Sequence, residues 1–254
     1  MAKGAYIGAS GVARKIKKGY IGVSDVARKI KKAYIGVGGV ARLFYQSGLP
    51  LSDLPEGALV SINENGSPVN FYLAKHDYES GLNGAGRILF VRQYCYDTGP
   101  YGRHSTYKYS NSDIDVWLNS TYLQLFDTEM QNQIGLTTFK SNEGGAQNLS
   151  RAVFVLSLQE LGFDGTYAYK LGSKLPTANI LKSAKNSSGS NVAQWTRNLY
   201  SDLNDEAYYI LSGGSKAGHD YDGRAYYRRP VFTLPSDMAV NPEPNADGSY
   251  TLIV

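Results

Sequence analysis

The sequence predicts an α+β fold with short strands, few helices and long loops, preceded by a β-rich repeat segment. Short β-prone runs are separated by loops rich in Gly, Ser and Asn, and capping patterns mark only three short helices. Residues 1–46 repeat a 14-residue unit rich in Tyr, Ile and Val. The chain has 254 residues, 42% of them hydrophobic and 19% charged, which is enough for a sizeable core. We therefore expect two parts, the basic repeats of residues 1–46 and a globular head of residues 47–254.

The repeats align in three copies. The coinciding residues are Tyr6, Tyr20 and Tyr34, then Gly8, Gly22 and Gly36, then Val12, Val26 and Val40, and finally Arg14, Arg28 and Arg42. Between the β-prone runs lie the pairs Ser10-Gly11, Ser24-Asp25 and Gly38-Gly39. Such two-residue joints predict hairpins, and because a lone hairpin is marginal in water, we expect copies from identical chains to associate in a stalk. The residues assigned to this contact are Tyr6, Ile7, Tyr20, Ile21, Tyr34 and Ile35.

The charge is divided between the two parts. Residues 1–46 hold ten Lys or Arg against Asp25 alone, whereas residues 47–254 hold 16 basic and 21 acidic residues, so the net charge of +4 conceals a basic arm on an acidic body. Three interpretations of the arm compete: a β-rich stalk, an arm that binds nucleic acid through its RKIKK clusters, and a solvated extension. The repeated Tyr-Ile-Gly triplets favour the stalk, because binding through charge needs only the charge to repeat. We expect a homo-oligomer, a trimer by analogy with viral fibres, and no nucleic-acid partner.

The body opens with strands and two capped helices. Residues 58–62 and 69–75 are predicted strands around a turn at residues 64–66, and residues 86–96 are a further apolar strand. Ser112 and Asp113 are expected to cap a helix that carries Ile114, Trp117 and Leu118 at helical spacing. A second short helix follows at residues 127–135 and ends near its glycine.

The second half of the body is predicted to be mostly strands and loops. Ser157 and Glu160 form a capping box, and Gly162 is placed to end a third short helix. The clearest late strands are residues 207–214, 228–235 and 249–254. The triplet EPN at residues 243–245 helps to bind mannose-type sugars in calcium-dependent lectins, but with no Trp-Asn-Asp nearby the flanking NPEPNADG indicates a plain turn.

Five stretches of the body occur in an order that resembles a known family. They are GALVSINENGSPVNFYLAKHDYESGLNGAGRILFVRQ, SDIDVWLNSTY, RAVFVLSLQELG, QWTRN and RRPVFTLPS. Together they resemble an uncharacterised domain family of phage tail proteins and of gut Gram-positive bacteria and their prophages. The repeat KKAYIGVGGVAR is similar to repeats that often precede this domain in phage and prophage structural proteins. The resemblance covers nearly the whole chain.

The resemblance implies a fold similar to that of C-type lectins, which is shared with formylglycine-generating enzymes and with variable proteins of diversity-generating retroelements. The family's Trp-Thr-Arg corresponds to residues 195–197, and its closing Arg-Pro-x-Phe-x-Leu-Pro corresponds to residues 229–235. We expect Trp195 and Phe232 in the core, and Arg197 and Arg229 to hold loops by hydrogen bonds. Because these structural roles fit all four residues, none of them is expected to be catalytic.

The sequence offers little for catalysis or cofactors. Formylglycine-type oxidation needs more than the one cysteine, Cys95, which we expect to be a buried small hydrophobe. His76, His104 and His219 lie far apart, without the spacing of a metal site. Nucleophile elbows, phosphate loops and H-E-x-x-H patterns are missing from the sequence, so we expect no enzyme activity, no cofactor and no metal. No apolar run is long enough to span a membrane, and no signal-peptide core is recognised, so we expect synthesis in the host cytoplasm and no membrane insertion.

The stretch from residue 198 to residue 227 has the composition of a binding surface. Tyr, Asn, Asp, Ser and Gly dominate it, as in antibody paratopes and in retroelement-diversified surfaces, although an ordinary solvated loop in a tyrosine-rich protein has a similar composition. Because side chains alternate along a strand, we expect some of the candidate contacts to face inward. The candidates are Tyr200, Asp202, Asn204, Tyr208, Tyr209, His219, Tyr221, Asp222, Tyr226 and Tyr227.

These observations predict a phage or prophage tail protein, part of a fibre or baseplate. Its head is expected to bind a glycan or protein of the bacterial surface, and its repeats to join it to further copies and to other virion tail proteins. Two alternatives stay open: a decorating or structural virion protein that binds no receptor, and a hydrolase of surface glycans.

Overall fold

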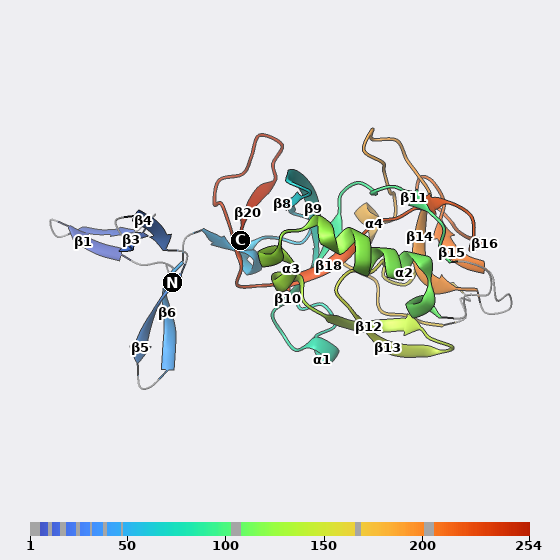
Figure 1. Ribbon diagram of the computed structural model, residues 1–254, viewed down its shortest axis with the longest axis horizontal. Helices are drawn as coiled ribbons and strands as arrows, with labels where there is room; N and C mark the ends of the chain where they lie inside the picture. The colour runs from blue at the N-terminus through green and yellow to red at the C-terminus, as the bar shows by residue number, and fades with distance from the viewer. Residues whose placement is uncertain are drawn as a thin grey trace.

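The computed structural model describes residues 6–9, 12–15, 19–23, 26–30, 32–37, 40–46, 48–102, 108–165, 169–200 and 206–254. In these ranges the chain is a mixed α and β protein with many strands, few short helices and long loops, as predicted. Figure 1 shows the strands of the repeats at one end of the molecule and the strands β14–β16 at the other.

The repeats contain β1 (Tyr6–Ala9), β2 (Val12–Lys15), β3 (Gly19–Val23), β4 (Val26–Ile30), β5 (Lys32–Val37) and β6 (Val40–Gln46). The body contains β7 (Leu49–Pro50), β8 (Leu59–Glu64), β9 (Ser67–Lys75), β10 (Arg87–Arg92), β11 (Thr98–Gly99), β12 (Thr137–Asn142), β13 (Ala146–Arg151), β14 (Gln194–Leu199), β15 (Glu206–Ile210), β16 (Ala217–Tyr221), β17 (Tyr226–Tyr227), β18 (Val231–Pro235), β19 (Ala239–Val240) and β20 (Tyr250–Ile253). Its helices are α1 (Ser80–Asn83), α2 (Asp113–Trp117), α3 (Thr128–Ile134) and α4 (Ala178–Leu181), with short 3-10 turns η1 (Leu51–Asp53), η2 (Tyr109–Asn111) and η4 (Leu123–Leu125) and a π-helical turn η3 (Leu118–Tyr122).

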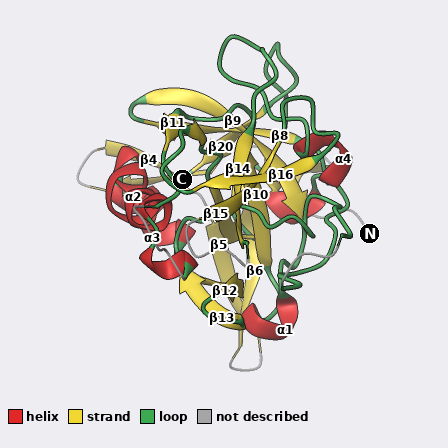
Figure 2. Cartoon of the chain, turned by 90° about the vertical axis from the view of Figure 1, so that its right-hand side faces the viewer, coloured by secondary structure: helices red, strands yellow, loops and turns green. Residues whose placement is uncertain are grey.

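Two larger sheets organise the body. A seven-stranded sheet has the order β18-β10-β9-β8-β20-β19-β7, and a five-stranded sheet has the order β11-β17-β14-β15-β16. Strand β14 of the second sheet is buried along its whole length. Strands β12 and β13 form a separate antiparallel pair. Figure 1 shows α2 and α3 following one another along the front of the body, and Figure 2 shows the same helices on one side of the sheets.

The predicted hairpins of the repeats are confirmed. Strands β1 and β2, β3 and β4, and β5 and β6 pair antiparallel, each pair forming its own two-stranded sheet. The pairing begins at Ala9 opposite Val12, at Val23 opposite Val26 and at Val37 opposite Val40, so two residues separate the strands of each hairpin. The 14-residue period therefore corresponds to one hairpin per unit.

The register of the hairpins separates the tyrosine positions from the isoleucine positions. Tyr20 lies opposite Lys29, and its neighbour Ile21 lies opposite Arg28. Residues directly opposite share a face of the sheet and successive residues alternate, so Tyr20 and Ile21 lie on different faces. Because the other two hairpins repeat this register, one surface can present the tyrosine positions or the isoleucine positions, but not both. The isoleucine face also carries the valines of each unit.

The turn and helix signals of the first half of the body are confirmed. Strands β8 and β9 are joined through Asn65 and Gly66, both with positive φ, as a tight two-residue hairpin requires. The Ser112 hydroxyl accepts a hydrogen bond from the backbone N–H of Asp115, 3.2 Å away, at the start of α2. Asp127 caps α3 through the N–H of Met130 at 2.8 Å.

The third expected helix is only a single turn. The capping box is present, because the Ser157 N–H donates to the Glu160 carboxylate at 2.8 Å and the Glu160 N–H donates to the Ser157 hydroxyl at 3.2 Å. No helix continues from it, and Gly162 reverses the chain with φ +82°. The Glu160 side chain is instead turned into the interior, where Tyr78 and Arg197 bind it. Contacts distant in sequence thus outweigh a local helix signal.

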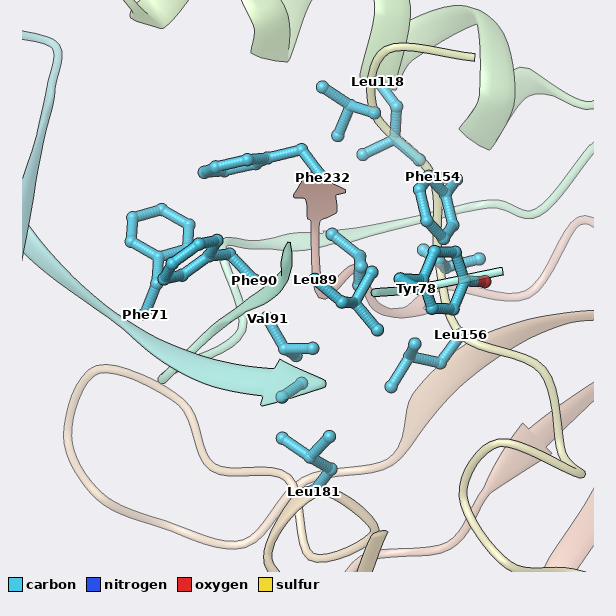
Figure 3. Close-up of a cluster of buried hydrophobic side chains, with 14 of the residues drawn as sticks. Phe71, Tyr78, Leu89, Phe90, Val91, Leu118, Phe154, Leu156, Leu181 and Phe232 are labelled. Atoms are coloured by element: carbon cyan, nitrogen blue, oxygen red, sulfur yellow. The ribbon is translucent and has the colours of Figure 1, made fainter. Parts of the chain in front are cut away.

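One apolar core joins the sheets to the helices. Figure 3 shows Phe71, Phe90 and Phe232 gathered from three neighbouring strands of the seven-stranded sheet. The rings of Phe71 and Phe232 lie 5.1 Å apart, and both side chains are fully buried. Aromatic pairs of this kind add about 0.5–1.5 kcal/mol to the free energy gained from burial alone.

Gly214 is expected to be the more sensitive of two adjacent glycines. Its φ is +72°, and a Cβ on it would lie 2.6 Å from the backbone C and O of Lys182. Gly213 has a similar φ of +90° but open space around its Cβ position. We expect Gly214→Ala to lower the free energy of unfolding by about 3 kcal/mol, the sum of backbone strain and overpacking, and Gly213→Ala by about 1 kcal/mol from strain alone. Urea denaturation measures both, and equal losses would show that the contact with Lys182 relaxes freely.

Candidate functional site

The tyrosine-rich stretch builds one edge of the five-stranded sheet. Strands β15 and β16 pair antiparallel with Tyr208 opposite His219 and Tyr209 opposite Gly218. Strand β14 lies beside β15, and β17 lies on the other side of β14. Figure 2 shows β14, β15 and β16 turned toward the viewer, at the end of the body away from the repeats. Because side chains alternate across a strand, the rings divide into two clusters on opposite faces.

The first cluster, called the His219 cluster, consists of Tyr200, Tyr208 and His219 with Glu206. The His219 ring stacks on Tyr200 with centroids 4.0 Å apart and an interplanar angle of 16°. Tyr208 packs against both rings, at 5.5 Å and 5.8 Å. Nδ1 of His219 hydrogen-bonds the Glu206 carboxylate across the two strands, and 42% of the His219 side chain is exposed. The cluster therefore presents a fixed imidazole ring to solvent.

The second cluster, called the Tyr226 cluster, stacks Tyr226 on Tyr209 with centroids 4.1 Å apart and an interplanar angle of 18°. Trp195 lies edge-on beneath both rings, at 4.8 Å and 6.0 Å. The Tyr226 hydroxyl donates to the Asp220 carboxylate at 2.8 Å. Gly218 leaves room for the Tyr209 ring, because a Cβ there would lie 3.0 Å from it. Desolvation, together with hydrogen bonds to Tyr209 and Asp220, raises the pKa of Tyr226 far above its usual range.

Six of the ten predicted contact residues lie at an accessible surface. His219 is exposed, and the half-buried candidates are Tyr200, Tyr209, Tyr221, Tyr226 and Tyr227. Asp202 and Asn204 lie outside the described residues. Preordered, partly exposed aromatic rings are suited to binding, because little side-chain entropy is lost when a ligand docks.

Two candidates are corrected by burial. Only 6% of Tyr208 and 1% of Asp222 are exposed, so neither side chain is available to a receptor on this surface. Tyr208 is covered by the other rings of the His219 cluster. The backbone carbonyl of Asp222 accepts hydrogen bonds from the N–H groups of Tyr101 and Gly102, which ties this turn to the interior.

Sequence reasoning missed the polar residues that fix the clusters. Glu206 holds His219, and Asp220 holds Tyr226. The period of two was a usable signal for Glu206, since it lies two residues before Tyr208 on the same strand face. Asp220 and Tyr226 are six residues apart around a turn, and no sequence pattern connects them.

The family residues named from the sequence are structural, as expected. Trp195 and Phe232 are buried, and the Trp195 indole N–H donates to the Gly99 carbonyl at 2.9 Å. The Arg197 guanidinium donates to the carbonyls of residues 140, 155 and 171. The Arg229 guanidinium donates to those of residues 92, 93 and 181. Both arginines therefore hold neighbouring loops together.

The cysteine, the EPN triplet and groups of possible metal ligands were the other chemical features considered from the sequence. Cys95 is 1% exposed, and desolvation raises the pKa of its thiol to about 11, which keeps it protonated. The Asn245 side chain bonds Ser249 and Thr251 within its own turn, in agreement with the turn expected there. Across the described ranges, no three His, Cys, Asp or Glu side chains gather as metal ligands would. No described helix has the length and apolar character needed to cross a membrane.

Comparison with known proteins identifies one family. The family model described as "Domain of unknown function (DUF6273)" matches residues 85–236, which include β14 to β17 and both aromatic clusters. No curated protein and no solved structure matches the chain.

Proposed function

The chain belongs to the DUF6273 family, and we propose that it is a non-enzymatic tail protein of a phage or prophage that binds a receptor on the bacterial surface. In this proposal the body is a receptor-binding head with a C-type-lectin-like fold. The repeats form a homo-oligomeric stalk that joins the head to other copies and to other tail proteins of the virion.

The receptor-binding role is inferred from the two aromatic clusters that are built around the β15–β16 hairpin. Stacked, half-exposed rings of Tyr209 and Tyr226 on one face and of Tyr200 and His219 on the other give this edge the composition of a protein or glycan interface. Each cluster is braced by a carboxylate, Asp220 or Glu206. Such bracing fixes ring positions before a ligand arrives, which favours binding over a merely structural role.

The placement of the carboxyl groups in the two clusters gives less support to the hydrolase alternative. A glycosidase needs two carboxyl groups that flank one open cleft. The two carboxylates of the clusters, Glu206 and Asp220, are each already hydrogen-bonded within a cluster. The decorating alternative differs only in the partner, because it requires the same aromatic surface to pack against a virion protein.

Replacing Tyr226 or His219 by Ala is expected to weaken binding to intact bacterial cells by roughly 30-fold, about 2 kcal/mol, because central aromatic anchors dominate interface energies. Binding of the fluorescently labelled full chain to a panel of Gram-positive gut bacteria, and to their isolated wall polymers, measures the loss. Tyr250→Ala is the matched control, since Tyr250 is also half-buried but lies on β20 in the other sheet. It is expected to leave binding unchanged. Equal losses for the control, or no binding by the unaltered chain to any strain, would contradict a receptor surface at this edge.

A further inference from the structure

A cleft of about 300 Å³ lies between β8 and β20, and it is called the β8–β20 cleft. Its buried walls come from Ile62, Met130 and Leu252, and its outer lining from Asn63 and Asn245. Strand β20 pairs with β19, and β19 pairs with β7, the strand that directly follows the repeats. Figure 1 accordingly shows β20 and the C-terminus at the end of the body from which the repeats leave. The cleft is therefore distant from the aromatic clusters and close to the stalk.

One wall of the cleft is the end of β8 that extends past its pairing with β20. Strand β20 pairs with β8 only at Tyr250 opposite Val60 and at Thr251 opposite Ser61, whereas β8 continues to Glu64 with β9 as its other neighbour. Backbone groups of successive strand residues point to alternate sides, so residues 62–64 direct at least one N–H and one C=O toward the cleft. An open edge of this kind accepts an extended peptide as an additional strand.

The segments around the cleft are acidic. Residues 59–70, 126–136 and 239–254 contain no Lys or Arg, and their acidic residues are Glu64, Asp127, Glu129, Glu243 and Asp247. Glu64 is buried and paired with Arg92, and the other four residues are exposed. Hydrogen bonds from Ser249 and Asn70 lower the pKa of Asp247 to about 2, so its charge persists at every physiological pH. The surroundings of the cleft thus carry negative charge that no basic residue of these segments offsets.

We propose that the β8–β20 cleft receives a strand of the basic repeats from a second copy of this chain. The inference rests on the proposed stalk, and it names the partner of the head within that assembly. The repeats are complementary to the cleft. Their ten Lys or Arg in residues 1–46 oppose the acidic surroundings, and their Ile and Val at strand positions match the apolar walls. Each described repeat strand pairs only within its own two-stranded hairpin, which leaves outer strand edges for pairing with another chain. Opposite charge then selects this edge over others and fixes the orientation of the pairing.

Photo-crosslinking from the rim of the cleft tests this assignment. The full chain carries a benzophenone amino acid at the exposed position of Asn63, and unlabelled chains are mixed with ¹⁵N-labelled chains before irradiation. We expect crosslinked peptide pairs that join position 63 of one isotope to residues 1–46 of the other. Crosslinks confined to a single chain, crosslinks to the body alone, or no crosslinks at all would overturn the proposal.

Charge reversal supplies the matched comparison. The double variant Glu129→Lys with Glu243→Lys is expected to lower the yield of mixed-isotope crosslinks roughly fivefold, because each exposed charge contributes up to about 1 kcal/mol. Asp53→Lys with Asp164→Lys changes the net charge equally at exposed sites elsewhere and is expected to lower the yield less than twofold. Equal effects would also overturn the proposal. The receptor surface is judged separately, since Tyr226→Ala is measured on cells, so either proposal can fail while the other stands.

Discussion

Glu160→Gln is expected to lower the free energy of unfolding by about 3–5 kcal/mol, because it leaves the buried Arg197 guanidinium without its counter-ion. The side chains of Glu160 and Arg197 are 0% and 1% exposed, and their closest N and O atoms are 2.5 Å apart. The same carboxylate accepts hydrogen bonds from the Tyr78 hydroxyl at 2.5 Å and from the Ser157 N–H at 2.8 Å. Glutamine keeps the shape of the side chain but replaces one carboxylate oxygen by an NH2 group, so the loss reports on the charge together with one lost hydrogen-bond acceptor. Guanidinium chloride denaturation of the full chain measures it.

The pair of Asp97 and Arg228 is the matched control for this experiment. Asp97 accepts two hydrogen bonds from the Arg228 guanidinium, but 40% of its side chain is exposed. Water replaces a lost partner at such a site, so Asp97→Asn is expected to cost no more than about 1 kcal/mol. If Glu160→Gln costs no more than Asp97→Asn, the buried pair does not hold the body together.

The contrast between these two ion pairs shows what local sequence can predict. The turn at Asn65-Gly66 between β8 and β9 and the Ser112 cap before α2 were predictable, because their causes lie within a few residues. Glu160 was predicted only as part of a capping box. Its partners Tyr78 and Arg197 lie 82 and 37 residues away, so no window of sequence contains them. The burial of this charge, and the shortening of the expected helix to one turn, follow from those distant contacts.

The candidate site shows a related limit. Composition located the aromatic edge, but composition does not state which face of a strand is covered. Tyr208 and Tyr209 are neighbours on β15, and alternation sends them to opposite faces, where Tyr208 is buried and Tyr209 is half-exposed. The stacks themselves depend on β14 lying between β15 and β17, which is a property of the sheet order. That order arises from long-range pairing, which a single sequence does not reveal.

Deletion of the repeats is expected to have the second large effect, on the oligomeric state of the protein. Removing residues 1–46 is expected to convert an oligomer into a monomer, because the body has its own buried core whereas each hairpin forms a separate two-stranded sheet that is marginal alone. Multi-angle light scattering of the full chain and of residues 47–254 measures the masses. The shortened chain is also expected to melt in a single cooperative transition. An aggregated product would show that the repeats contribute to the core of the body.

The register of the hairpins makes this prediction specific to one face. The Ile21 position shares its face with Val23 and Val26, the Ile35 position with Val37 and Val40, and the Ile7 position with Ala9 and Val12, so the isoleucine face is the more aliphatic one. We expect the triple replacement of the isoleucines at positions 7, 21 and 35 by Ser to dissociate the oligomer, and the same replacement of the tyrosines at positions 6, 20 and 34 to leave it intact. Dissociation by the tyrosine variant alone would assign the contact to the opposite face.

Salt distinguishes this stalk from an arm that binds nucleic acid. An aliphatic contact between hairpins is not weakened by added salt, because screening acts on charges and not on buried apolar surface. The full chain is therefore expected to stay oligomeric from 0.1 M to about 1 M NaCl, even where the charge-assisted contact at the β8–β20 cleft loosens. Binding of DNA through the RKIKK clusters would instead depend strongly on salt, because it releases counterions and weakens steeply as the salt concentration rises. A full chain that is monomeric at every salt concentration, and that binds DNA only at low salt, would replace the stalk by the nucleic-acid arm.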